Sequence, residues 1–197
     1  MKNLIINKQL DFIQKYNNFD NEKLEVIRYG LESVYILVTK MIVILLVSYL
    51  LGLLKETLIF LICYNFIRIP SFGLHATKSW ICLVSSLLIF ILLPLLCNNI
   101  ELPIYLKSII GLISLIFILK NAPADTYKRP IINKKRRLFF KITSSIIAFI
   151  MIMVSLFIEN QFLANSLLIS IVLQCFMISP TVYGIFKLPY NNYKKYI

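Results

Sequence analysis

The stretch ITSSIIAFIMIMVSLFIENQFLANSLLISIVLQCFMI, residues 142–178, decides the fold class. It consists of two apolar runs, residues 142–158 and 162–178, separated by the short polar sequence ENQ. Neither run contains a charged residue. A helix that crosses a bilayer needs about 20 mostly apolar residues, and each run comes close to that length. We therefore expect a hairpin of two membrane-spanning helices joined by a tight turn.

The same pattern recurs along the rest of the chain. Hydrophobic residues make up 59% of the 197 residues, and the mean hydropathy is +0.80, whereas soluble domains are about 45–50% apolar. The run at residues 58–69 is short and is followed by Pro70, so a short, tilted or broken helix is expected there. The sequence thus predicts an all-α polytopic membrane bundle of about six spans, the other runs being residues 34–54, 80–96 and 104–119.

The N-terminal residues 1–33 are more polar and are predicted to form amphipathic helix. Asp20 is placed to cap a second helix that begins near Glu22, and apolar residues then recur at helical spacing up to Val34. One interpretation is a segment that lies on the cytoplasmic membrane surface, and the other is a packing element under the bundle. We expect residues 1–33 to be this surface segment and residues 34–197 to be a single integral membrane domain.

The net charge of +12 is distributed unevenly over the predicted connections. Residues 1–33, 68–79, 120–141 and 179–197 carry eighteen Lys and Arg, whereas residues 55–57, 97–103 and 159–161 carry only Lys55. The positive-inside rule then predicts six passes with both termini in the cytoplasm. The rule also explains the excess of Lys and Arg over Asp and Glu without a nucleic-acid partner. The eighteen are Lys2, Lys8, Lys15, Lys23, Arg28, Arg68, Lys78, Lys120, Lys128, Arg129, Lys134, Lys135, Arg136, Arg137, Lys141, Lys187, Lys194 and Lys195.

The sequence RIPSFGLHATKSWIC, residues 68–82, contains the single histidine of the chain, His75, and Cys82 seven residues later. An imidazole that takes the proton of a cysteine thiol creates a nucleophile and can then protonate a leaving amine. On a straight helix the two residues would stand about 10.5 Å apart, so a dyad requires the chain to fold back between them. Pro70 and Gly73 favour such a break.

Two interpretations of this pair remain open from the residues alone. His75 and Cys82 form a catalytic dyad, or His75 is an interfacial polar residue and Cys82 a small hydrophobe, as we expect for Cys63, Cys97 and Cys175. Arg68 is either a positive-inside residue or a partner for an oxyanion or a substrate carboxylate. Asp125 is expected to bond to nearby amides in a turn, and it is also a candidate for orienting His75.

The basic stretch KNAPADTYKRPIINKKRRLFFK, residues 120–141, is predicted to be a cytoplasmic loop. The positive-inside rule explains most of the charge of this stretch. The run KKRR could in addition bind an acidic peptide or anionic lipid headgroups through Lys134, Lys135, Arg136 and Arg137.

Two motifs carry a resemblance to a known family. The first is an Arg, then Gly-x-His, then a Cys seven residues beyond the His, which Arg68, Gly73, His75 and Cys82 match in order and spacing. The second is APADT…KRPI…KKRR, which matches Ala122, Pro123, Ala124, Asp125, Thr126 and Pro130. With the amphipathic start and the six runs, most of the chain resembles the accessory gene regulator B proteins (AgrB), membrane endopeptidases of bacterial quorum sensing. One departure is Phe72, where the family usually has the first glycine of a pair.

The resemblance implies a reaction, a substrate and a location. Cys82 would attack a carbonyl of a small AgrD-like propeptide with His75 as base and then acid, and a thioester acyl-enzyme would rearrange to a macrocyclic thiolactone or lactone. Arg68, Gly73 and Asp125 would be auxiliary or substrate-positioning residues, and the KKRR run would dock the acidic propeptide tail. The expected setting is a bacterial cell membrane, where the lipid bilayer is a partner, and the resemblance also implies a homodimer. No cofactor is implied.

Two other functions are weighed against this one. The first is a non-enzymatic membrane peptide exporter or peptide-binding partner, which would tolerate loss of Cys82 and would fail on changes to Lys107 or Gln174. The few strongly polar residues within the runs argue against it. The second is a metal site, which one histidine and scattered cysteines do not support.

The predicted topology is testable with reporter fusions. A reporter that is active only in the cytoplasm should be active when fused after residue 130 and inactive when fused after Asn160, because the first site lies in the basic set of connections and the second does not. A reporter that is active only outside the membrane should give the reverse pattern. Activity of the external reporter at residue 130 would contradict the orientation.

Overall fold

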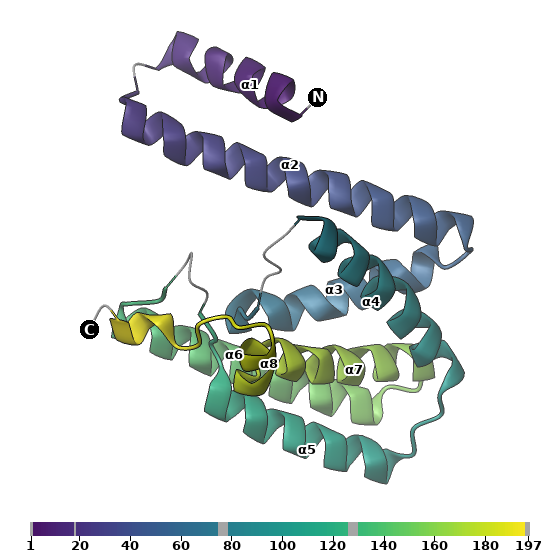
Figure 1. The fold of residues 1–197 in the computed structure, drawn as a ribbon. Coiled ribbons are helices and arrows are strands. Elements are labelled where there is room, and N and C mark those ends of the chain that lie inside the picture. Colours follow the sequence, from purple (N-terminus) through teal and green to yellow (C-terminus); the bar gives the residue numbers. More distant parts are fainter. Residues whose placement is uncertain (1, 18, 75–78, 126–129, 196–197) are drawn as a thin grey trace. The chain divides into compact units, whose positions relative to one another are not determined.

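The structure, a computed structural model, describes residues 2–17, 19–74, 79–125 and 130–195, and most of these residues are helical (Figure 1). It divides into two compact units, residues 1–47 and residues 48–197. We call the second unit the bundle. The all-α membrane bundle predicted from the sequence is confirmed.

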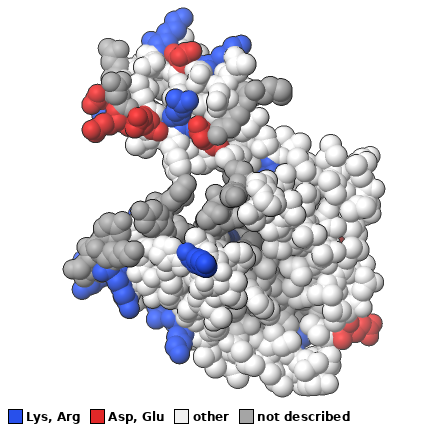
Figure 2. Space-filling model, viewed as in Figure 1, with Lys and Arg blue, Asp and Glu red and all other residues white. Residues whose placement is uncertain are grey.

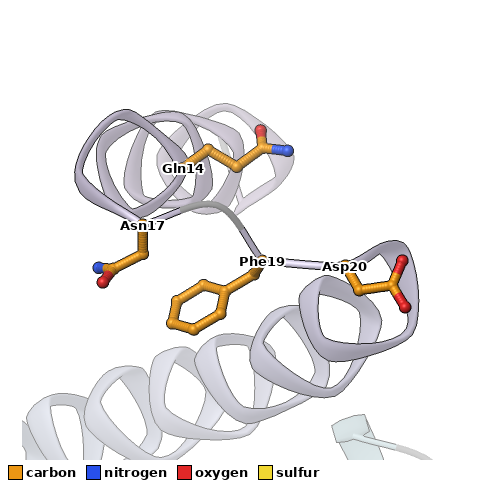
Figure 3. A pocket seen from close by; sticks show the side chains of 4 residues that line it. All are labelled: Gln14, Asn17, Phe19 and Asp20. Atoms are coloured by element: carbon orange, nitrogen blue, oxygen red, sulfur yellow. The ribbon is translucent and has the colours of Figure 1, made fainter.

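The first unit contains α1, Lys2–Tyr16, and most of α2, Asn21–Leu50. The carbonyl of Asp20 accepts the N–H of Leu24 at 3.0 Å, so the second helix begins where the sequence places it. Figure 3 shows an open hollow at the connection between the two helices, where the ring of Phe19 lies beside α2. Its lining is Gln14, Asn17, Phe19 and Asp20, which offers no nucleophile and no pair of titratable groups.

Helix α2 corrects the predicted end of the first apolar run, which is at Leu50 and not at residue 54. The amphipathic segment and the apolar run form one helix from Asn21 to Leu50, which passes residue 33 without a break. The boundary predicted after residue 33 therefore remains a prediction about where the chain enters the bilayer. The connection to the next helix is residues 51–53, where Gly52 has a positive φ of 70°, and not residues 55–57 as predicted. Lys55 lies in the first turn of α3.

Helix α3, Leu54–Ser71, is longer than the predicted run and is not broken at Pro70. A proline removes one helical hydrogen bond, and the turn that follows is remade by other donors. The Ser71 hydroxyl donates to the carbonyl of Ile67, and the N–H of Phe72 donates to that of Arg68 at 3.0 Å. Because these bonds close the last turn, the helix continues past Pro70 and ends at Ser71.

The remaining long helices match the predicted runs, with two shifted ends. They are α4, Ser79–Asn99; α5, Ile104–Asn121; α6, Lys134–Phe157; and α7, Gln161–Met177. Cys97, expected in a loop, is buried in α4. Helix α6 begins at Lys134 because the Asn133 side chain caps it, accepting the N–H groups of Lys135 and Arg136 at 2.9 and 3.3 Å. The predicted basic loop is therefore helical from residue 134 onward.

Helix α7 lies at the centre of the bundle and packs against α3, α4, α5 and α6 (Figure 1). Small residues permit close approach between neighbours, as where a Cβ on Gly111 of α5 would come within 2.8 Å of Ile152 in α6. The chain then ends in α8, Pro180–Ile185, and a short 3-10 helix, η1, Asn192–Lys195. We call residues 179–195 the C-terminal segment.

Four described helices are long and apolar enough to cross a membrane by length and composition: Glu22–Leu50, Trp80–Asn99, Ile104–Asn121 and Lys134–Phe157. Helix α7 is apolar but shorter. On the face of the bundle that Figure 2 shows, the long side is largely uncharged, whereas Lys and Arg gather at one end, near the start of α6 and the C-terminal segment. An uncharged flank and a basic end are what a helical bundle in a bilayer requires.

Candidate functional site

Three of the residues predicted to form the site, Arg68, Gly73 and Asp125, lie at or beside the end of α3. Arg68 lies in the last turn of α3, Gly73 follows that helix, and Asp125 lies in the connection between α5 and α6. Cys82 lies in the first turn of α4. His75 lies outside the described residues, so the predicted pairing of His75 with Cys82 remains a prediction.

Arg68 binds the main chain that follows its own helix. Its Nη1 donates to the carbonyl of Phe72 at 2.6 Å, and its Nη2 donates to the carbonyl of Leu74 at 2.6 Å and weakly to that of Gly73 at 3.4 Å. A guanidinium presents several donors in a planar fork, which suits a row of carbonyls. Arg68 therefore ties down the three residues that directly precede His75.

The turn formed by Phe72 and Gly73 has a backbone that favours glycine. Phe72 has φ 58° and ψ −135°, and Gly73 has φ 113°. Both values lie in the left-handed half of conformational space, which costs a residue with a Cβ roughly 1–3 kcal/mol. The position where the sequence departs from the family pattern is thus one at which glycine would be preferred.

A second connection closes over this turn. Residues 122–125 run parallel to the turn and form a bridge between Phe72 and Ala124. The N–H of Ala124 donates to the carbonyl of Ser71 at 3.0 Å, and the N–H of Gly73 donates to the carbonyl of Ala124 at 2.9 Å. The APADT motif is therefore in direct contact with the Arg-to-Cys motif, although about fifty residues separate them in sequence.

The end of α7 supports the turn from a third direction. Gln174 is fully buried, and its Nε2 donates to the carbonyl of Phe72 at 2.8 Å. The carbonyl of Met177 accepts the N–H of Leu74 at 2.9 Å. Sequence reasoning missed Gln174 as a site residue, considering it only as part of a transport path. A strongly polar residue inside an apolar run was the available signal, because a buried amide needs a specific partner.

Cys82 is half-buried, and its helix packs against α3 and α7. The carbonyl of Cys82 accepts the Ser85 hydroxyl at 3.2 Å. The first turn of a helix carries partial positive charge from its N–H groups, which favours a negatively charged group at that position. This placement suits a nucleophile better than the middle of an apolar helix would.

Asp125 is fully buried, and its side chain reaches the C-terminal segment. Its Oδ2 accepts the N–H of Tyr193 at 2.8 Å, and its main-chain carbonyl accepts the Tyr183 hydroxyl at 3.3 Å. This oxygen therefore binds an amide 68 positions away. The predicted bond to amides within the turn stays a prediction, because residues 126–129 lie outside the described residues.

The four basic residues of the KKRR run differ in their surroundings. Lys134, Lys135 and Arg136 are exposed, and the guanidinium of Arg136 lies 5.5 Å from the centroid of the Phe140 ring. Arg137 is partly buried and is bound to the C-terminal segment. The exposed residues remain available for an acidic ligand, whereas Arg137 already has partners within the chain.

The described residues contain no group of three or more His, Cys, Asp or Glu that could hold a metal ion.

Comparison with known proteins decides the family. A family model described as "Accessory gene regulator B" matches residues 6–178, which cover α1 from Ile6 onward and the whole of α2 to α7. The chain belongs to this family. It is therefore a membrane protein with a role in the accessory gene regulator system, in agreement with its apolar helices.

Individual members of the family cover nearly the whole chain. A putative AgrB-like protein of Clostridium acetobutylicum is 28% identical over 184 residues, which is 93% of this chain and 88% of that protein. A putative AgrB-like protein of Listeria monocytogenes is 34% identical over 90% of this chain and 87% of its own length. The accessory gene regulator protein B of Staphylococcus aureus is 31% identical over 88% of this chain and 91% of its own length. No solved structure matches the chain.

The geometry of the turn predicts the effect of Gly73→Ala. A Cβ at this position would lie 2.6 Å from Nη1 of Arg68 and 2.7 Å from the carbonyl oxygen of Met177, on a backbone with φ 113°. Backbone strain and overpacking together should lower the free energy of unfolding by roughly 2–4 kcal/mol or force the turn to open. Thermal unfolding in detergent would measure the first effect.

Gly184→Ala is the matched control, because a Cβ there meets no atom within 4 Å and its φ is not positive. An unfolding temperature for Gly73→Ala equal to that of Gly184→Ala would contradict the geometry of the turn.

Proposed function

We propose that this chain is a membrane-embedded cysteine endopeptidase that removes the C-terminal tail of a small AgrD-like propeptide and promotes closure of the remaining peptide into a macrocycle. The observation that carries the proposal is the braced turn at residues 72–74. Arg68, the 122–125 connection and the end of α7 all bind it, and the next residue is His75. Such bracing is expected where an imidazole must be held in one orientation.

In the proposed first step, His75 removes the thiol proton of Cys82, and the sulfur attacks a peptide carbonyl of the propeptide. The tetrahedral intermediate collapses with cleavage of the C–N bond, and the protonated His75 gives its proton to the leaving amine. The tail departs with a new amino terminus. The rest of the propeptide stays attached to Cys82 as a thioester.

In the proposed second step, a thiol or hydroxyl side chain of the bound propeptide attacks the thioester. His75 takes the proton of the attacking thiol or hydroxyl and gives it to the Cys82 sulfur as the thioester C–S bond breaks. The product is a macrocyclic thiolactone or lactone, and the Cys82 thiol is restored. Transfer from a thioester to a thiol changes the free energy little, so the activation gained in the first step is conserved. Water must be excluded for this to occur, and a site at the membrane edge supplies that exclusion.

Arg68 acts in this proposal as a positioning residue. Both of its terminal nitrogens donate to main-chain carbonyls at the turn, which supports a role in holding the turn. The alternative role, as a partner for a substrate carboxylate or an oxyanion, stays a prediction. Gly73 provides the backbone conformation that lets those carbonyls converge on the guanidinium.

The exposed basic residues Lys134, Lys135 and Arg136 form the proposed docking surface for an acidic propeptide tail. They lie at the start of α6, and a ring contact connects that region to the turn, since Phe140 packs edge-to-face on Phe72 with centroids 4.9 Å apart. Docking there would place the tail near the braced turn. We propose that Arg137 contributes to the site by holding the C-terminal segment of this chain and does not bind the propeptide tail.

The proposed setting is a bacterial cell membrane with both termini in the cytoplasm. The propeptide would approach from the same side, because residues 68–79 and 120–141 belong to the basic set of connections. A homodimer, implied by the family resemblance, remains a prediction.

Cys82→Ala and His75→Ala should each abolish release of the propeptide tail while the protein level in the membrane stays normal. The reason is that the first removes the nucleophile and the second removes the base and acid. Cys82→Ser should be nearly inactive, because a hydroxyl needs stronger activation than a thiol. Tail release is measured by mass spectrometry after co-expression with a propeptide.

Cys175→Ala is the matched control, since Cys175 is also a half-buried helical cysteine but lies in α7. It should retain tail release and form the covalent thioester with the propeptide at Cys82. Tail release by Cys82→Ala, or a thioester mapped to another residue, would refute the proposed site.

Replacement of Lys134 and Lys135 together by Gln should raise KM for an acidic-tailed propeptide roughly two- to thirtyfold and leave kcat unchanged. Exposed ion pairs contribute about 0.2–1 kcal/mol each, and binding that is equal in ground and transition states appears in KM. The difference from wild type should vanish in about 1 M salt, where charges are screened within about 3 Å.

Lys107→Gln is the control, because Lys107 lies at the opposite end of α5 from the basic connection. An unchanged KM in the double variant at low salt would show that the start of α6 does not bind the tail.

A further inference from the structure

The C-terminal segment lies on the end of α5 and on the 122–125 connection instead of extending away from the bundle. The Tyr183 side chain is buried, and its hydroxyl donates to the carbonyl of Asp125 at 3.3 Å. The Tyr190 hydroxyl lies 3.5 Å from Oδ1 of Asn121, and its ring packs on that of Tyr183 with centroids 5.1 Å apart. Burial raises the pKa of both tyrosines above their ordinary value, so both hydroxyls stay protonated and able to donate.

The carboxylate of Asp125 supplies a stronger tie. A fully buried carboxylate is costly unless a donor meets it, and Oδ2 receives the N–H of Tyr193 at 2.8 Å. A hydrogen bond from a main-chain amide to a charged oxygen is among the stronger kinds. Because the donor is a backbone group, this contact requires the chain to reach residue 193 but does not depend on the side chain there.

Arg137 holds the same segment from the side of α6. Its Nη2 donates to Oδ1 of Asn191 at 3.3 Å, and its guanidinium carbon lies 3.6 Å from the centroid of the Tyr193 ring. That is close stacking for a cation on an aromatic face. Residues 191–193 are therefore fixed between Asp125 and the first turn of α6.

The connection that receives these contacts is the one that holds the turn before His75. Ala124, adjacent to Asp125, exchanges main-chain hydrogen bonds with Ser71 and Gly73. Within the described residues, the path from Tyr193 to Gly73 thus runs through Asp125 and Ala124 without a gap.

We infer that residues 183–193 of the C-terminal segment are a positioning element of the catalytic site, which holds the 122–125 connection against the Phe72–Gly73 turn. The segment touches neither Cys82 nor substrate in this scheme and acts through Asp125 and Ala124. Its effect on propeptide processing rests on the proposed function. Its effect on the turn does not, and the two can be measured separately.

The coupling is tested by a pair of truncations read out by amide hydrogen exchange. A chain that stops after Tyr190 loses Asn191 and Tyr193, whereas a chain that stops after Lys195 retains η1 and every contact described above. In the shorter chain the amides of Gly73 and Ala124 should exchange roughly tenfold or more faster than in the full chain, because their protection depends on the connection staying closed. The longer truncation should match the full chain. Equal protection in both truncations would overturn the inference.

A substitution pair covers the case in which the shorter chain fails to fold. Tyr193→Ala keeps the N–H that binds Asp125 but removes the ring from Arg137, and Tyr193→Phe keeps both. Faster exchange of Gly73 and Ala124 in the Ala variant only, with unchanged exchange in residues 144–155 of α6, supports positioning. Equal acceleration throughout α6 would mean general destabilisation and would overturn the inference.

Tail release from a co-expressed propeptide is then measured in the same variants and in Cys82→Ala. The Tyr193→Ala variant should show kcat reduced by roughly tenfold or more, and Tyr193→Phe should restore it. If Cys82→Ala still releases the tail, the proposed endopeptidase fails while the exchange result stands. If exchange is faster but kcat is unchanged, the C-terminal segment braces the turn without serving catalysis, which overturns its positioning role.

Discussion

The contact between the Arg68 guanidinium and the carbonyls of Phe72 and Leu74 is the interaction on which the rest of the site depends. The main-chain carbonyls that follow the end of a helix have no partners within that helix, and each needs a donor where it is withdrawn from water. A partly buried guanidinium is costly in turn unless its donors are used. The carbonyls therefore provide acceptors for the guanidinium, and the guanidinium provides donors for the carbonyls. As a result, the chain after α3 turns sharply instead of continuing as a helix.

The sharp turn requires support because its backbone is strained. Phe72 adopts a conformation that glycine would adopt at lower cost, and the penalty of roughly 1–3 kcal/mol must be offset by surrounding contacts. Its carbonyl receives two donors, from Arg68 and Gln174, and its ring packs on Phe140. The phenylalanine thus gains ring packing on α6 at a position where the family resemblance leads one to expect glycine.

Several parts of the fold could be predicted from hydropathy, and the errors have a common cause. The hairpin of α6 and α7 and the position of α5 follow from apolar runs bounded by polar residues. Hydropathy indicates where a segment avoids water, however, and not where its hydrogen bonds stop. The polar start of α6 is helical because Asn133 caps it, and α3 passes Pro70 because later donors close its final turn.

The sequence by itself determined the all-α membrane class, the uneven distribution of charge and the residues that resemble the family's motifs, since these depend on composition and on spacing along the chain. Only the tertiary structure decided that the two motifs touch, that Gln174 and Met177 brace the turn, and that Asp125 binds Tyr193. These contacts are made by main-chain groups or by partners up to 102 residues apart, and neither leaves a local pattern in the sequence. Which carbonyl an amide or guanidinium reaches is settled only when the helices have packed.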